Sequence, residues 1–274
     1  MSLKPLAVIL TSLLLLSSAL PVLWLFSLSI KSRKDILSSR PDALFPEPTL
    51  DNYREVLTTD SGLQYLGNSL FIASLSTMLA LALGVPAAYA IGRLRGKARP
   101  NLLLALLGTR MLPSVTVAIP LFLLFRSIGL LDSRISVIVM HSAINVSLVV
   151  WLVTGFVHEI PTSLEDSAKL DGETSLGVLI NILLPLIAPG IAVAALFSFI
   201  FSWNEFFFTM LLSSTEQQTI TARIPSLITQ QGTKWGQVAA FGVLSILPVL
   251  FLAGFVKKYA ALFINSRGST QHDR

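Results

Sequence analysis

The sequence predicts an all-α membrane protein with six transmembrane helices. Of its 274 residues, 53% are apolar and only 13% are charged, and the mean hydropathy is +0.73. This composition is typical of a membrane protein and not of a soluble domain. A hydrocarbon core of about 30 Å requires about 20 helical residues, so uncharged runs of that length can be counted directly along the chain.

Five uncharged runs are long enough to cross the bilayer, and a sixth, from Pro100 to Phe125, is interrupted only by Arg110. Prolines within or near these runs indicate a packed bundle, because neighbouring helices can satisfy the carbonyls that a proline frees. These prolines are Pro86, Pro113, Pro120, Pro189 and Pro248. We expect one transmembrane domain over residues 1–274, with spans at about 5–30, 66–92, 100–126, 135–157, 185–212 and 236–258.

The first run has the basic start and Leu-rich body of a secretory signal peptide. It continues unbroken from Lys4 to Lys31, however, and its end lacks a small-x-small cleavage site. We therefore interpret it as the first span.

Basic residues leave the orientation of the chain open. The dense stretch Arg93–Arg99 and the pair Lys257 and Lys258 favour termini on the cytoplasmic side, whereas Lys31, Arg33 and Lys34 favour the reverse. The net charge of +5 reflects these flanks and does not indicate a nucleic-acid partner. The absence of cysteine excludes disulfides, thiolate metal sites and thiol catalysis.

Several function classes lack their motifs. The segment Gly92–Ala98 resembles a phosphate-binding loop, but its glycine spacing is wrong and it ends in Ala where Ser or Thr is required, so ATP must be hydrolysed elsewhere. The sequence contains no H-E-x-x-H motif, no G-x-S-x-G motif and no paired carboxylates within a span, so nothing in it indicates an enzyme. A secondary transporter usually needs ionisable residues inside its spans, and only Arg110 and Glu205 qualify. Secondary transport therefore remains a weaker alternative.

The polar segment 158–184 has the local chemistry of two helices joined by a glycine turn. Thr162 or Ser163 is expected to cap the first helix, with Glu165 or Asp166 completing a capping box. Lys169 lies near the negative end of the same helix.

Gly172 can adopt the left-handed conformation that ends a helix. A second amphipathic stretch, Thr174–Leu184, leads to Pro185, where we expect the fifth span to begin. Such a hairpin suits the groove of a partner protein, but its spacing alone equally allows a solvated interfacial hairpin.

This segment resembles the EAA loop of ABC importer permeases, whose pattern is E-A-A, three residues, G, nine residues, I-x-L-P. Here every spacing is kept, with Asp166-Ser167-Ala168, then Gly172, Ile182, Leu184 and Pro185. Asp166 replaces the usual Glu, and Ser167 replaces an Ala.

Three further stretches resemble the carbohydrate branch of the family, in particular the second permease of maltose-type systems. They are Met111-Leu112-Pro113 with Pro120-Leu121-Phe122, Gly129-Leu130-Leu131-Asp132, and Phe201-Ser202-Trp203-Asn204-Glu205-Phe206. The resemblance covers most of the chain and ends near the C-terminus, where Ala260–Arg274 lacks the Gly-rich ending common in sugar permeases.

The resemblance implies a type I ABC importer permease fold in a bacterial inner membrane. The EAA loop 158–184 and both termini would be cytoplasmic, and the loop 213–236 would be extracytoplasmic. The implied partners are a second permease, an ATPase dimer that binds ATP and Mg, and an extracytoplasmic solute-binding protein. The implied substrate is a sugar, oligosaccharide or polyol, with a glycerol phosphate as an alternative. No cofactor is expected in this chain.

The resemblance also assigns the first helix of the EAA loop to contact with the ATPase. Leu164, Ala168 and Leu170 would offer apolar contact, and Asp166 and Asp171 would offer carboxylates. The complete coupling set is Leu164, Glu165, Asp166, Ala168, Lys169, Leu170, Asp171 and Gly172.

A binding-protein contact follows from the same resemblance, whereas a substrate path is indicated by residue chemistry, because sugars are bound by stacking on aromatic faces with amides and carboxylates on their hydroxyls. The path residues are Arg110, Asn145, Trp203, Asn204 and Glu205, with His141 one helical turn before Asn145. Their alternative role is helix packing, and for Arg110 pairing or snorkelling. The binding-protein contact comprises Gln230, Gln231, Gly232, Thr233, Lys234 and Trp235, whose amides can compete for the hydrogen bonds of a sugar; the alternative is an ordinary surface turn.

Overall fold

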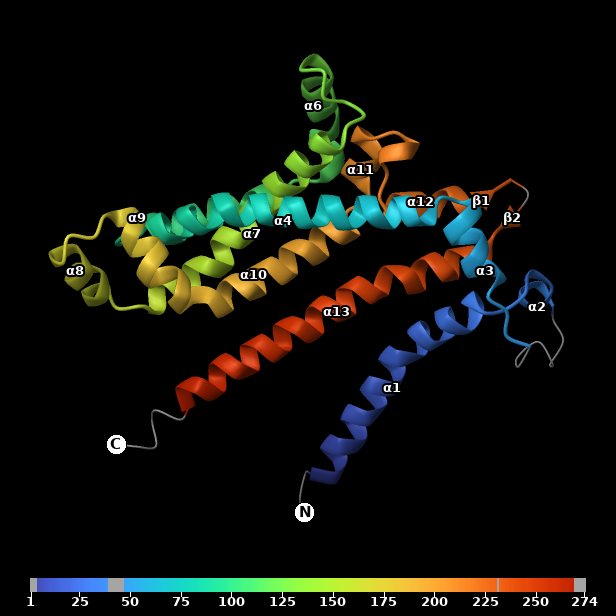
Figure 1. Ribbon diagram of the computed structural model, residues 1–274, viewed down its shortest axis with the longest axis horizontal. Coiled ribbons are helices and arrows are strands. Elements are labelled where there is room, and N and C mark those ends of the chain that lie inside the picture. The colour runs from blue at the N-terminus through green and yellow to red at the C-terminus, as the bar shows by residue number, and fades with distance from the viewer. Residues whose placement is uncertain (1–3, 39–46, 231, 269–274) are drawn as a thin grey trace. The chain divides into compact units, whose positions relative to one another are not determined.

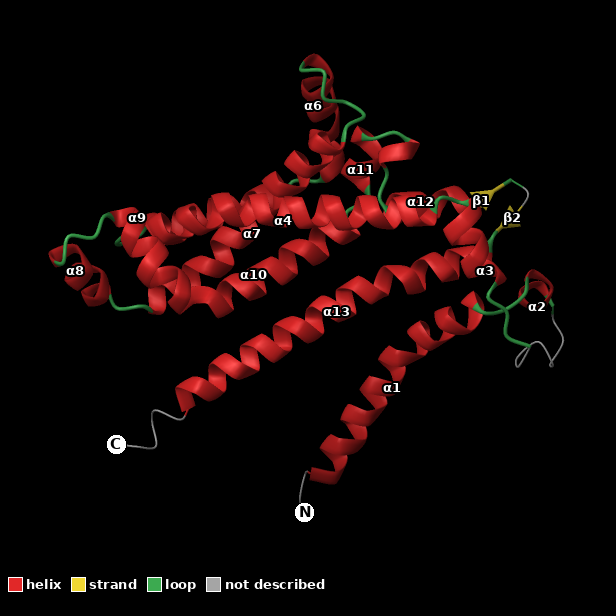
Figure 2. Ribbon diagram, viewed as in Figure 1, coloured by secondary structure: helices red, strands yellow, loops and turns green. Residues whose placement is uncertain are grey.

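The computed structural model describes residues 4–38, 47–230 and 232–268. Most of these residues are helical, and the strands within these ranges form one short hairpin (Figure 2). The chain divides into two compact units, Met1–Leu66 with Arg223–Pro248, and Gly67–Ala222 with Val249–Arg274.

The first unit contains α1 (Lys4–Ser29), α2 (Arg33–Leu37), α3 (Asp51–Arg54) and the hairpin of β1 (Ile228–Thr229) and β2 (Gly232–Thr233). It also contains the π-helical turn η2 (Glu55–Thr59), the 3-10 turn η5 (Ile224–Leu227) and the first part of α13 (Trp235–Gly268). Asn52 closes the end of α1, since its amide donates to the carbonyls of Ser29 (2.9 Å) and Lys31 (2.8 Å). Gln237 of α13 donates to the carboxylate of Glu55.

Three long helices form the core of the second unit: α4 (Gly62–Gly92), α7 (Arg134–Glu159) and α10 (Leu184–Asn204) (Figure 1). Small and β-branched side chains fill the space between them, namely Ala80, Val85, Ala88, Val149, Val153, Val157, Ile187 and Ala194. Gly84 lets α4 approach α7, because a Cβ there would lie 2.6 Å from Val149 Cγ1. Small residues at helix contacts are typical of membrane bundles.

Within the described part of the chain, five helices are long and apolar enough to cross a membrane: Leu10–Ser29, Gly62–Gly92, Arg134–Glu159, Ser175–Asn204 and Trp235–Val256. The region expected to hold the third span consists of α5 (Ala98–Arg110) and α6 (Ser114–Ser127), which meet at 83° and give a sixth span if counted together. The break falls at Pro113, which lacks an N–H and disfavours helix at the preceding residue.

A second core cluster joins α6 to α7 and to α11 (Phe207–Leu212). Phe125 of α6 packs with Val137 and Met140 of α7 and with Phe208 and Leu212 of α11. The C-terminal end of the bent helix pair α5–α6 is therefore held to α7 and α11 by buried apolar contacts.

The bounds of the fifth span differ from the expected ones at both ends. α8 (Thr162–Leu170) is a separate helix, but α9 (Ser175–Gly177), the π-helical turn η3 (Val178–Leu183) and α10 form one continuous rod. The second hairpin helix is thus not a separate element, because Pro185 lies in the first turn of α10, where its missing N–H is tolerated.

At the other end, α10 stops at Asn204, short of residue 212. The carboxylate of Glu205 accepts hydrogen bonds from the backbone N–H groups of Phe208 and Thr209, both at 3.1 Å. These bonds start α11 in a new direction. The remaining short elements, η4 (Thr215–Gln217) and α12 (Ile220–Arg223), follow α11.

Candidate functional site

The turn after α8 has the predicted left-handed glycine. Gly172 has φ +91°, its N–H donates to Lys169 O (3.1 Å), and the N–H of Glu173 donates to Ala168 O (3.0 Å). This pair of bonds is the Schellman arrangement that ends many helices. The predicted hydroxyl cap at the start of α8 is wrong, since Pro161 occupies the cap position and makes no side-chain bond there.

The inner face of α8 is fixed by a buried ion pair. Glu165 is 3% exposed, and its Oε1 accepts a hydrogen bond from Arg93 Nε at 2.6 Å while also pairing with Arg93 Nη2. The hydroxyl of Tyr89 donates to the other carboxylate oxygen at 3.0 Å. Because Tyr89 and Arg93 are one turn apart at the end of α4, these contacts clamp α8 to that helix.

Apolar packing adds a second attachment. Ala168 is buried against Val178, Leu179 and Leu183 of the rod that continues into α10. Two residues predicted to face a partner, Glu165 and Ala168, therefore face the inside of the protein. The reason is helical rotation: the two side chains lie within about one turn of each other on one face of α8.

The outer face of α8 carries the rest of the predicted coupling set. Leu170 is 89% exposed and Leu164 is 46% exposed. Asp166, Lys169, Asp171 and Gly172 are exposed as well. An amphipathic helix that leaves a leucine uncovered outside the spans offers a surface for another protein.

A cavity of about 90 Å³ brings together three of the five predicted substrate-path residues. Arg110, Asn145 and Glu205 line it, together with His141, Ile144, Phe201 and Ser202. These residues come from the end of α5, the middle of α7 and the end of α10. All of them belong to the second unit.

Trp203 and Asn204 do not line this cavity. Trp203 is buried and stacks on Phe199 at a ring distance of 5.6 Å, while Asn204 is exposed and donates to Ile200 O of its own helix. Successive helical residues point about 100° apart, so the cavity takes Phe201, Ser202 and Glu205 from one face. Spacing of three and four residues was the signal that would have identified Phe201 and Ser202.

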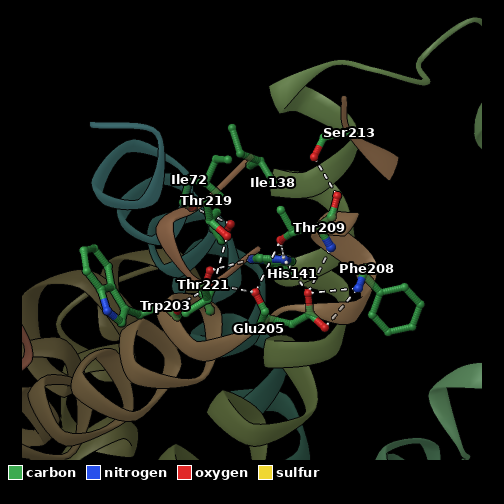
Figure 3. Close-up of polar contacts among 12 residues, drawn as sticks. Ile72, Ile138, His141, Trp203, Glu205, Phe208, Thr209, Ser213, Thr219 and Thr221 are labelled. Atoms are coloured by element: carbon green, nitrogen blue, oxygen red, sulfur yellow. Dashed lines mark hydrogen bonds and ion pairs between the residues drawn. The ribbon is translucent and has the colours of Figure 1, made fainter. Parts of the chain in front are cut away.

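His141, which lines the cavity, lies in a network of polar contacts (Figure 3). His141 Nδ1 lies 2.8 Å from Ser202 Oγ, and Nε2 lies 3.1 Å from Glu205 Oε2 and 3.2 Å from Thr209 Oγ1. The network ties α7 to the junction of α10 and α11. No cluster of three or more His, Cys, Asp or Glu residues suited to a metal occurs in the described part of the chain.

The chain matches the family of binding-protein-dependent transport system inner membrane components over residues 80–262. It belongs to this family.

Relatives of the permease are similar over nearly their whole length. The sulfoquinovosyl glycerol transport system permease protein of Agrobacterium fabrum is 32% identical over 251 residues, which is 91% of this chain and 88% of the relative. The trehalose transport system permease protein of Mycobacterium tuberculosis is 34% identical over 248 residues, covering 88% of this chain and 89% of the relative.

Solved structures agree with the fold. A chain of a bacterial ABC transporter involved in the import of the acidic polysaccharide alginate superposes with a TM-score of 0.75 at 25% identity. The match covers 93% of the permease and 95% of that chain. The permease is therefore a membrane-embedded, multi-helix ABC importer subunit, as predicted.

The predicted binding-protein contact forms the hairpin and the start of α13. Ile228 pairs with Thr233 and Thr229 with Gly232, and Gln230 lies in the exposed turn. Lys234 and Trp235 follow at the start of α13 and are exposed, whereas Gln231 lies outside the described residues. Gly232 has φ +109°, which favours glycine in the turn.

Proposed function

We propose that this permease is one of two membrane-spanning subunits of an ATP-driven, binding-protein-dependent importer for a sugar, oligosaccharide or polyol. Three similar proteins support the substrate class, because their names refer to sulfoquinovosyl glycerol, trehalose and alginate. A separate ATPase dimer binds ATP and Mg, and an extracytoplasmic protein delivers the solute. In this arrangement both termini and α8 face the cytoplasm.

The exposed leucine on α8 carries the proposal. Leu170 is 89% exposed on a helix whose opposite face is fastened by the Glu165–Arg93 pair. A rigidly held helix with an uncovered apolar residue suits a groove in a partner. The exposed charges beside it, Asp166 and Asp171, add about 0–1 kcal/mol each, so the apolar contact and the helix shape supply most of the affinity.

The contacts of α8 with α4 and α10 can transmit its movement to the membrane-spanning helices. Movement of α8 is passed to α4 through Glu165, Arg93 and Tyr89, and to the α10 rod through Ala168 and its apolar neighbours. Closure of two ATPase subunits can thereby rotate two helices of the permease together. This mechanism needs no nucleotide site in the permease itself.

The hairpin of β1 and β2 is proposed to contact the binding protein. Its exposed turn at Gln230 and the neighbouring Lys234 offer donors and acceptors that can replace sugar hydroxyls. Deletion of residues 231–234 should abolish binding-protein-stimulated transport while leaving basal ATPase activity intact. Unchanged stimulated transport would contradict this role.

The coupling role is tested by two matched leucine substitutions. Leu170→Asp should release the ATPase during copurification of the assembled importer, because a carboxylate replaces the exposed apolar contact. Leu37→Asp is the control, since Leu37 is 67% exposed on α2 and is expected on the opposite side of the membrane. Retention of the ATPase by Leu170→Asp, with normal ATPase stimulation, would contradict the proposal.

A further inference from the structure

A groove of about 340 Å³ lies between the start of α5 and the end of α7, within the second unit. Arg99 and Leu103, one turn apart, line it from α5. Trp151, Gly155 and His158 line it from one face of α7, since they are four and three residues apart. The volume falls in the range of about 300–1,000 Å³ that is typical of ligand sites, so the groove can hold part of a larger molecule.

One end of the groove is positively charged without a counter-charge. Arg99 and His158 form no ion pair in the described part of the chain. Glu159 follows His158 in sequence, but helical rotation turns it about 100° away, and it does not line the groove. The loop before α5 adds the exposed residues Arg95 and Lys97 at the same end. An anion that enters here meets attraction and no acidic neighbour in the groove wall.

The other end of the groove is apolar and aromatic. Trp151 is 45% exposed, and Leu103 and Leu152 are half-buried beside it. At a rise of 1.5 Å per residue, Trp151 lies about 10 Å along the helix from His158. Gly155 keeps the path between them open, because a Cβ there would meet nothing within 4 Å. The groove therefore changes from cationic to apolar over the distance that separates a lipid head group from its acyl chains.

The position of the groove along α7 agrees with this pattern. α7 is long and apolar enough to cross the membrane, and His158 lies in its last turn, where the span reaches the head groups. Tryptophan is enriched at this depth. Basic pockets between spans on the cytoplasmic side bind anionic lipid head groups, and the proposed orientation of the permease places this end in the cytoplasmic leaflet.

We propose that the groove is a binding site for an anionic phospholipid. The phosphate is held by Arg99, whose guanidinium can donate two parallel hydrogen bonds, and by a ring N–H of His158. An acyl chain passes over Gly155 and packs on Trp151. The bound lipid ties the start of α5 to the end of α7. This function goes beyond transport, since it does not depend on the solute.

Charge favours a lipid over a helix of another subunit as the occupant. An apolar helix in the groove would cover Arg99 and His158 without supplying a counter-charge, and burying an unpaired charge is strongly unfavourable. A phosphate supplies that charge, and its acyl chain supplies the apolar contact.

Fluorescence quenching of Trp151 tests the proposal, because bromine atoms on an acyl chain quench a tryptophan that they contact. The assembled importer is reconstituted in phosphatidylcholine vesicles that contain equal small fractions of brominated phosphatidylglycerol or brominated phosphatidylcholine. The difference between this importer and its Trp151→Phe variant isolates the signal of Trp151. Brominated phosphatidylglycerol should bind about fivefold more strongly, which corresponds to about 1 kcal/mol.

Three substitutions localise the preference. Arg99→Gln should remove most of it. Lys97→Gln is the matched control, since it removes the same charge from an exposed residue that does not line the groove, and it should keep the preference. Gly155→Leu should lower quenching by both lipids, because its side chain fills the groove without colliding with the protein.

Three results would overturn the proposal. Equal quenching by the two lipids would show contact with acyl chains and no selection of the head group. No quenching by either lipid would show that protein covers the groove in the importer. An equal loss of preference in Lys97→Gln and Arg99→Gln would assign it to general surface charge. Since quenching is measured without ATP or solute, these results leave the proposed transport function untouched, and that function is tested separately by transport and ATPase assays.

Discussion

Two arginines in the second unit occupy contrasting surroundings. Arg93, at the end of α4, contacts the Glu165 carboxylate through two nitrogens, and Tyr89 binds the other oxygen. Arg110, at the end of α5, has no carboxylate within ion-pair distance in the described ranges and keeps Nη1 unpaired. The first arginine holds two elements together, whereas the second faces a cavity. Pairing within the chain thus distinguishes a charge that joins two helices from one that has no carboxylate partner in the described ranges.

Replacing each arginine separately should give the largest difference in stability between the two surroundings. Arg93→Met leaves the buried Glu165 carboxylate without its cation and should lower the free energy of unfolding by about 3 kcal/mol. Arg110→Met removes an unpaired cation from the cavity and should leave stability equal or higher. Thermal unfolding of the purified variants in one detergent measures both. Equal destabilisation would show that the two surroundings do not differ in the way described.

Gly84 lies where α4, the helix that holds α8, packs against α7, a helix that lines the cavity. A side chain there must displace Val149 of α7, so Gly84→Val should destabilise the protein by about 2 kcal/mol through overpacking. Gly155→Val on α7 is the matched control, because a Cβ at Gly155 meets nothing within 4 Å. Equal unfolding temperatures for the two variants would show that close approach at Gly84 is not required.

A smaller effect is expected at the turn after α8. Gly172 has φ +91° but open space around its Cβ position, so a substitution is penalised by backbone strain and not by collision. Gly172→Val should cost about 1 kcal/mol and tilt α8. Stimulated ATPase activity of the assembled importer should fall more than it does in Asp166→Asn. Full activity in Gly172→Val would show that the orientation of α8 does not control coupling.

The smallest effect concerns Asp132, in the connection between α6 and α7. Hydrogen bonds from the side chain and backbone of Ser214 hold the pKa of Asp132 below its ordinary value, and the backbone bond measures 2.7 Å. A lowered pKa in the folded state adds stability above about pH 4 that is lost as the pH falls through the folded pKa. Asp132→Asn, which also tolerates the φ of +59°, should unfold at a slightly lower temperature than wild type at pH 7. The gap should close as the pH falls through the folded pKa of Asp132, and a gap that is constant with pH would contradict this role.

Features that depend on local chemistry could be predicted from the sequence. Uncharged runs identified five membrane helices, and the need for a left-handed residue identified Gly172. The break at Pro113 was not expected, because the length of an apolar run does not show whether its two halves are collinear. Pro185 was misleading, since a proline in the first turn of a helix does not show where a preceding helix ends.

Features that depend on partners distant in sequence could not be predicted in the same way. In the sequence, Glu165 has the position of a capping residue. Its ion-pair partner Arg93 is 72 residues away, so only the fold shows that the two side chains are in contact. Trp203 and Asn204 are adjacent to Glu205 in sequence, but helical rotation turns them away from the cavity. Orientation on a helix therefore separates the predicted residues that line the cavity from those that do not.

Site-specific photocrosslinking from position 170 tests most directly the claim that α8 is the ATPase-binding element. A photoreactive phenylalanine analogue replaces Leu170 in the assembled importer, and the same analogue at Leu37 serves as the control. The account predicts a crosslink to the ATPase subunit from position 170 and none from position 37. A crosslink from position 37 alone, or none from position 170 in an importer that retains stimulated ATPase activity, would contradict it.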